Sequence, residues 1–212
     1  TKLKDNTITN AFYENLTVRA DISNMGASDV LEIFSIYNQT TGQEPIDPEL
    51  FNPITSGSIE KSRILIQFPI ENISSDRSSG KMPASGSVQF LLKVFNVAHN
   101  ASIPKDFSLT INALSKSWEE GYGLDMEGYS DTGFIELTGG YGSSWKYNES
   151  GSFWENRGGD YLTDPKYSYI YDFKTGLEDI ELDITPMVEG WIAGDIPNYG
   201  ILIKLSILSE SL

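Results

Sequence analysis

Ile180-Glu181-Leu182-Asp183-Ile184 alternates apolar and acidic residues, and this alternation decides the fold class. Successive side chains of a β-strand point to opposite faces of a sheet, so a period of two buries the apolar residues and leaves the carboxylates in solvent. The same period recurs at 88–95, 107–113 and 201–208. Four such segments in one chain predict an all-β protein.

Shorter apolar runs are expected to form further strands at 16–18, 30–37, 64–68 and 167–173. Several of them are apolar on both faces, which favours a sheet that is covered on its outer side or paired with another copy. Many short strands without intervening helices are typical of a sandwich or barrel.

One short helix is expected at 185–194. Thr185 can cap it, Pro186 suits the first helical position, and Gly194 can end it. Its apolar face consists of Met187, Val188, Trp191 and Ile192. Nothing else in the chain is clearly helical.

The 212 residues read as a single domain, 1–212, with two long loops at 38–60 and 121–166. The first loop is rich in proline, and the second is rich in Gly, Tyr, Trp and Asp. The sequence shows no low-complexity linker and no internal repeat that would indicate a second domain.

The net charge of −15, from fifteen Lys and Arg against thirty Asp and Glu, excludes whole classes of partner. Nucleic-acid binding and attachment to anionic lipid both require a basic surface, so neither is expected. No apolar run is long enough to insert into a membrane. The absence of cysteine excludes disulfides, thiolate zinc sites and cysteine nucleophiles.

Catalysis has little support in the residues. A Ser-His-Asp triad would have to use the single histidine, His99, with Asp106 or Asp76, and no Gly-x-Ser-x-Gly turn accompanies it. A glycosidase needs two facing carboxylates. The candidates are Glu119, Glu120, Asp125, Glu127, Asp131, Asp160 and Asp164. With thirty acidic residues such pairs arise by chance, so we predict no enzyme and no catalytic residue.

Acidic and amide side chains also gather in the second long loop, where they could ligate a calcium ion. They are Asp125, Glu127, Asp131, Asn156, Asp160 and Asp164. The spacing is not that of an EF-hand, and Asp and Asn are equally typical of turns. We therefore expect no cofactor, and structural calcium stays an open alternative.

The same region carries thirteen aromatic rings between 118 and 171. Sugar rings stack on aromatic side chains, so a ligand is expected to contact Tyr122, Trp145, Trp154 and Tyr161. The alternative is that these rings cap one end of the sandwich or bury a subunit interface.

Five blocks in a fixed order complete the pattern. They are Asn24 to Leu31, Ser62 to Phe68, Ser117 to Gly123, Ser144-Trp145 with Trp154 and 158–161, and 183–204 with Thr185, Trp191 and Tyr199. Together they resemble the DNRLRE domain, a jelly-roll module similar to a carbohydrate-binding module family that recognises acidic polysaccharides. The resemblance covers about residues 5 to 205. It implies a jelly-roll β-sandwich with one short C-terminal helix, and it carries over no catalytic residue.

Three further features are similar to a branch of that family found in virion structural proteins of large tailed phages. They are the opening strand 5–10, the block 115–118 and the long loop 38–60. The resemblance implies a non-enzymatic neck, tail-fibre or capsid-surface component at the virion surface, outside the cell. Its expected partners are other virion proteins and further copies of itself, with a host-surface glycan as an open addition.

Two alternatives remain. One is a secreted or cell-surface polysaccharide-binding module attached to a glycan-degrading enzyme, to which five N-x-S/T sequons lend weak support. The other is a lyase or glycosidase that uses Glu119, Glu120 and Asp160. The charge of −15 would repel an acidic polysaccharide unless calcium or a basic patch intervened, so assembly is favoured over sugar capture.

Overall fold

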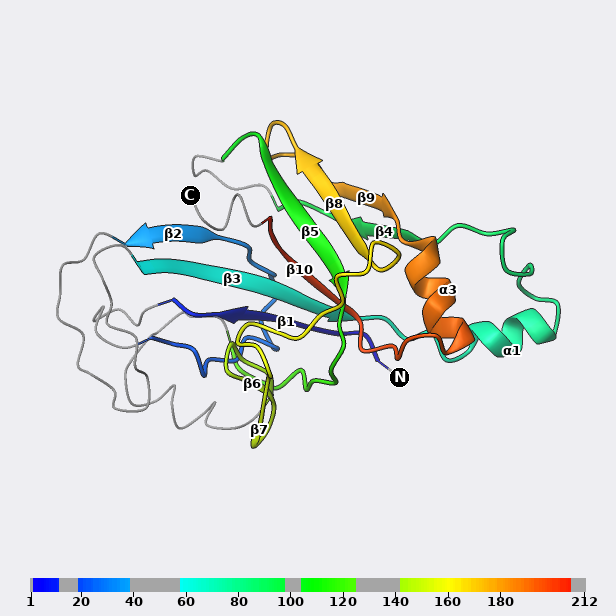
Figure 1. The fold of residues 1–212 in the computed structure, drawn as a ribbon, viewed down its shortest axis with the longest axis horizontal. Coiled ribbons are helices and arrows are strands. Elements are labelled where there is room, and N and C mark those ends of the chain that lie inside the picture. Colours follow the sequence, from blue (N-terminus) through cyan, green and yellow to red (C-terminus); the bar gives the residue numbers. More distant parts are fainter. Residues whose placement is uncertain (1, 12–18, 39–57, 98–103, 125–141, 207–212) are drawn as a thin grey trace.

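The computed structural model describes residues 2–11, 19–38, 58–97, 104–124 and 142–206 (Figure 1). Two helices occur in these ranges, α1 (Ile73–Ser78) and α3 (Thr185–Ala193). The strands are β1 (Lys4–Thr9), β2 (Ser35–Asn38), β3 (Ser58–Gln67), β4 (Leu91–Val94), β5 (Phe107–Ala113), β6 (Tyr147–Glu149), β7 (Ser152–Phe153), β8 (Ser168–Phe173), β9 (Ile180–Asp183) and β10 (Ile201–Leu205).

Antiparallel sheets dominate the fold. A six-stranded sheet has the order β1-β3-β10-β5-β8, with β2 also paired to β3, and two smaller sheets consist of β4-β9 and β6-β7. The all-β class is confirmed. The antiparallel pairing suits a β-sandwich, whereas jelly-roll connectivity stays a prediction.

Most of the expected strands are present. The alternating segments correspond to β4, β5, β9 and β10, and the runs at 64–68 and 167–173 correspond to β3 and β8. The prediction for 30–37 is wrong in extent, because only its end forms β2. The run at 16–18, residues 207–208 and most of the loop at 38–60 lie outside the described residues.

The main core lies between one face of the six-stranded sheet, the β4-β9 pair and α3. Ile203 of β10 is opposite Ile64 on one side and Ile111 on the other, and all three are buried. Leu92 and Ile180 close this core from β4-β9. Burying each such side chain is worth about 1.5–3 kcal/mol, so the alternation in the sequence supplies much of the driving force.

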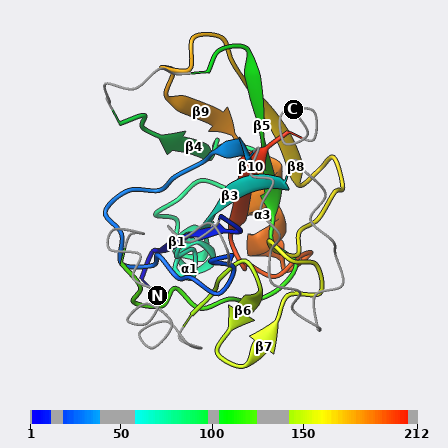
Figure 2. The same cartoon turned by 90° about the vertical axis from the view of Figure 1, so that its left-hand side faces the viewer.

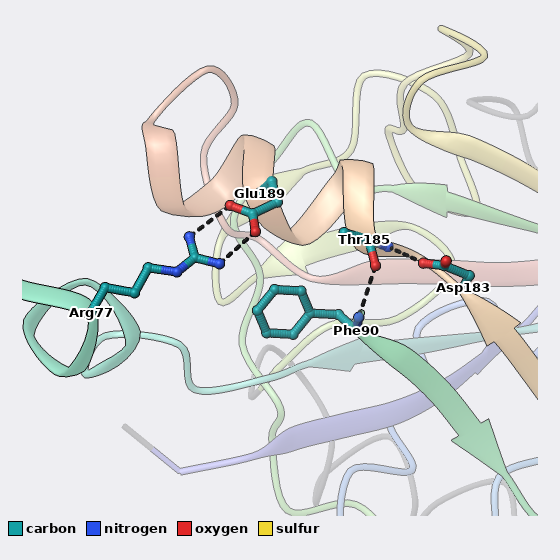
Figure 3. Close-up of polar contacts among 5 residues, drawn as sticks. All are labelled: Arg77, Phe90, Asp183, Thr185 and Glu189. Carbon is teal, nitrogen blue, oxygen red and sulfur yellow. Dashed lines mark hydrogen bonds and ion pairs between the residues drawn. The ribbon is translucent and has the colours of Figure 1, made fainter. Parts of the chain in front are cut away.

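Helix α3 is where the sequence expected it, but its start differs in detail (Figure 3). Thr185 is the first helical residue rather than its cap. Its hydroxyl accepts a hydrogen bond from the Phe90 N–H at 2.8 Å, and its own N–H donates to Asp183 Oδ1 at 2.8 Å. The predicted capping hydroxyl therefore ties α3 to Phe90, the residue before strand β4. Gly194, with φ of 79°, ends the helix as expected.

The sequence did not predict helix α1, because its residues show no apolar period. In the structure none of its residues is buried. It lies at the end of the molecule beyond α3 (Figure 1). Arg77 holds it there, since the guanidinium donates to both carboxylate oxygens of Glu189 on α3 (Figure 3). With nine residues, α3 is the longer described helix, and neither helix can reach across a bilayer.

Candidate functional site

A second core covers the opposite face of the six-stranded sheet, and it is built from the loop that was predicted to bind a ligand. Ile8, Leu65 and Leu202 contribute from the sheet, and Leu114, Trp118, Trp145 and Trp154 contribute from the segment 114–161. We call the described part of this segment, 114–124 and 142–161, the loop layer. Figure 2 shows its hairpin β6-β7 and the pair β4-β9 on opposite sides of the six-stranded sheet.

The loop layer is fixed by buried amides. Asn24 Nδ2 donates to the carbonyls of Glu120 (2.7 Å) and Ser143 (2.8 Å), and Asn24 Oδ1 accepts from the Gly123 N–H (2.8 Å). Asn6 Nδ2 reaches both the carbonyl and the hydroxyl of Ser143, each at 2.8 Å. Two side chains thus join three loop segments to β1 in the interior.

Gly121 allows this arrangement. It has a φ of 82°, and a Cβ there would come within 2.3 Å of the Asn24 side chain. A positive φ by itself favours glycine at this position. The second reason, close approach to a buried amide, becomes visible only in the structure.

Arg63 and Asp160 anchor the far end of the loop layer. The Arg63 guanidinium donates to the Gly158 carbonyl at 2.7 Å and lies 4.8 Å from the centre of the Trp145 ring. Asp160 accepts the N–H groups of Glu155 (2.7 Å) and Asn156 (2.8 Å) and the Asn156 amide (2.9 Å). Both charged groups are buried and serve the local backbone.

The four rings predicted to contact a ligand are placed differently from one another. Trp145 and Trp154 are 7% and 4% exposed and belong to the second core, and Tyr161 packs against that core. Tyr122 is 78% exposed. The four side chains therefore do not present one shared surface, and Tyr122 is the one among them that is largely exposed.

The acids considered as catalytic or calcium-binding candidates serve as backbone acceptors or surface ion-pair partners wherever the structure describes them. Glu119 accepts from the Ser150 N–H (3.2 Å), Asp164 accepts from the Lys166 N–H (2.8 Å), and Glu120 lies 3.6 Å from the Lys2 ammonium. Within the described ranges no three His, Cys, Asp or Glu side chains converge in a way that could hold a metal ion. His99, Asp125, Glu127 and Asp131 lie outside those ranges.

The alternative triad orienters bind lysines instead. Asp76 lies 3.6 Å from Lys81, and Asp106 lies 4.0 Å from Lys174. At the rim of the loop layer, burial raises the pKa of Asp21 even though Arg157 lies 3.0 Å away. Burial also lowers the pKa of Lys4, whose ammonium donates to the Trp118 carbonyl at 3.0 Å. These contacts join segments of the chain and place no nucleophile beside a base.

A second feature lies at the end of the β4-β9 pair. Phe95, Val97 and Leu177 are 74%, 59% and 62% exposed. Asn96 joins their two segments, because its Nδ2 donates to the Gly176 carbonyl and its N–H donates to Asp179 Oδ1, both at 2.8 Å. We call these three apolar residues the apolar tip.

The sequence held a signal for the apolar tip that the ligand prediction did not use. Phe95 follows Leu91 and Lys93 on the outward-facing side of the alternating segment 88–95. A phenylalanine on the solvent side of a strand is the kind of residue that marks a contact surface.

Comparison with known proteins returned no match, whether to a family model, to a curated protein or to a solved structure. The resemblance to the DNRLRE domain and to its phage branch therefore stays a prediction from the sequence blocks.

Proposed function

We propose that this chain is a non-enzymatic structural domain that acts in assembly at a virion surface, as a neck, tail-fibre or capsid-surface component. The apolar tip is the observation that carries the proposal, since three large apolar side chains lie in solvent at one end of the β4-β9 pair. Exposed apolar clusters on otherwise polar proteins mark contact surfaces. The virion assignment comes from the resemblance of the sequence blocks.

The hydrogen bonds that the acidic residues make support a role without enzymatic activity. Asp160 and Asp164 accept backbone N–H groups that fix turns of the loop layer and the segment after it. A general acid or base must instead have its carboxylate free to reach a substrate. We expect no release of reducing ends and no unsaturated product from any polysaccharide.

The proposed partners are other virion proteins and further copies of the chain, with a host-surface glycan as a second kind of contact. The net charge of −15 keeps a multi-copy surface protein soluble and argues against a nucleic-acid partner.

Immunogold labelling tests the virion assignment. Antibodies against the folded chain are applied to purified particles of the phage whose genome encodes it. Gold is expected at the neck, tail fibres or capsid surface. Unlabelled particles, with the chain recovered only from the soluble lysate, would contradict the assignment.

A polysaccharide-binding module attached to a glycan-degrading enzyme is the second candidate, and the exposed ring of Tyr122 favours it. A glycan array probed with the wild type and with Tyr122→Ala separates the two proposals. Binding to a glycan that the variant loses would support the module, and no binding on the array would leave assembly as the proposed role.

A further inference from the structure

We propose that the apolar tip is the docking site for an apolar knob with a basic rim, supplied by a different protein chain. This inference rests on the proposed assembly role and makes it specific, because it names the surface that docks and the chemistry of what it binds.

The apolar tip is held in place before any partner arrives. Glu178 accepts the N–H groups of Lys174 (3.0 Å) and Thr175 (2.7 Å), which closes the turn that carries Leu177. The Tyr171 hydroxyl donates to the Asp179 carbonyl at 2.8 Å. Below the turn, the rings of Phe107 and Phe173 stack with their centres 4.7 Å apart.

A prearranged surface loses little conformational entropy on binding, and this is how a small patch can contribute useful affinity. Exposed side chains on a turn with this many internal hydrogen bonds are better suited to docking than the same side chains on a loose loop. The turn is tied to the β4 segment as well, through Asn96.

The charges around the apolar tip determine which partner fits. The two segments that carry it, 91–97 and 172–181, contain four carboxylates and two lysines, a net charge of −2. One of the two lysines already forms an ion pair within this region, since the Lys93 ammonium lies 2.8 Å from the Glu181 carboxylate. The other carboxylates accept hydrogen bonds from uncharged donors: Ser108 for Asp172, backbone N–H groups for Glu178, and the Asn96 N–H for Asp179.

Glu178, in the turn that carries Leu177, keeps its charge at any physiological pH. The backbone N–H groups around Glu178 lower its pKa to about 2. The rim of the apolar tip has more carboxylates than lysines, and lysine or arginine side chains around a partner's apolar knob would complement it.

The same charges argue against a second copy of this chain at the apolar tip. A symmetric pair places the same patch on both sides of the contact, so two acidic rims would face each other. The whole chain adds a charge of −15 to each side. Further copies in an assembly would then have to meet through another surface.

Two labelled synthetic peptides serve as probes. Both have a Leu-Trp-Leu centre, flanked on each side by three lysines in one and by three glutamates in the other. Fluorescence anisotropy with the folded chain is expected to give at least about tenfold tighter binding of the lysine peptide, with a preference that weakens as salt is raised.

Variants locate the binding. Phe95→Ser combined with Leu177→Ser should weaken binding of the lysine peptide at least about tenfold, and either single change should weaken it less. Ile170→Ser is the matched control, since Ile170 is exposed on the outer face of β8, away from the apolar tip. It should leave binding unchanged. Near-ultraviolet circular dichroism checks that every variant is folded.

Three results would overturn the inference. They are equal binding of the two peptides, lysine-peptide binding that the double variant retains, and a dimer in sedimentation velocity that the double variant converts to monomer. The last result would make a second copy the occupant. If immunogold labelling finds the chain on the particles and one of these three results is also obtained, the assembly role stands and only the proposed partner is rejected.

Discussion

The guanidinium of Arg77 on α1 is paired with the carboxylate of Glu189 on α3 through both of its terminal nitrogens, with Nη1 2.7 Å from Oε2. It also lies 5.9 Å from the centre of the Phe90 ring. Because α1 buries none of its residues, this pair is what fixes the helix to the body of the protein. A six-residue helix without such support would be marginal.

Breaking that pair should release α1 without unfolding the domain. In Arg77→Ala, we expect amide hydrogen exchange at 70–80 to rise at least about tenfold, while the strands of the main core keep their protection. Lys81→Ala is the control, because Lys81 makes only an exposed ion pair with Asp76. Unchanged exchange at 70–80 in Arg77→Ala would contradict this role.

The same pair gives a pH dependence whose sign can be worked out. The hydrogen bond from Arg77 lowers the pKa of Glu189 below its ordinary value of 4.5. A carboxyl with a lowered pKa in the folded state contributes stability above its unfolded pKa and loses it as the pH falls through the folded value. Protection of the 70–80 amides from hydrogen exchange in the wild type should therefore decrease when the pH is lowered below about 4.5. Glu189→Gln should lack this dependence. Identical pH profiles in the two proteins would count against it.

Gly121→Ala and Gly86→Ala separate close packing from backbone strain. Both glycines have a φ of 82°, but a Cβ at Gly86 would meet nothing within 4 Å, whereas one at Gly121 would overlap the Asn24 side chain. Urea unfolding should show a loss of about 1 kcal/mol for Gly86→Ala and clearly more for Gly121→Ala. Equal losses would mean that the contact with Asn24 does not form.

Asn24→Ala should cost about 2–3 kcal/mol, because it removes one side chain that serves three buried or partly buried backbone groups. Gln89→Ala is a suitable comparison, since that amide makes a single exposed bond to Asp183 at 3.3 Å. Its expected cost is below about 0.5 kcal/mol. A loss below 1 kcal/mol for Asn24→Ala would show that the loop layer is not held by this network.

Leu65 and Ile66 test whether both faces of the six-stranded sheet are packed. They are neighbours on β3 and point into the second and the main core respectively. Leu65→Ala and Ile66→Ala should each cost about 2–5 kcal/mol in chemical unfolding. A cost near zero for Leu65→Ala would mean that the loop layer adds no second core.

Alternation in the sequence was sufficient to predict β4, β5, β9 and β10, because every second side chain of these strands faces the main core. Helix α1 could not be predicted in this way, since its position depends on the ion pair between Arg77 and Glu189, which lie 112 positions apart in the chain. Strand β1 was found only through the resemblance. Its polar residues gain their partners, such as Ser143 for Asn6, from distant loops.

The candidate site was harder to predict than the fold. Trp145 and Trp154 suit a sugar platform and a buried core equally well by residue type, and only the position of the loop layer on the sheet decides between the two. Asp160 looked available for catalysis or calcium, yet its acceptor oxygens meet N–H groups four and five residues away. The exposure of Phe95, by contrast, could have been anticipated, because the alternation places Phe95 on the same outward-facing side of its strand as Lys93.

Cross-linking mass spectrometry on intact particles tests the assembly role most directly. Lys93 and Lys174 flank the apolar tip and are both exposed, so a lysine-reactive cross-linker can report what covers it. We expect links from these two lysines to a different virion protein, and their loss when the particles carry the Phe95→Ser, Leu177→Ser double variant. Links from Lys93 and Lys174 only to this chain itself, or absence of the chain from the particles, would contradict the account.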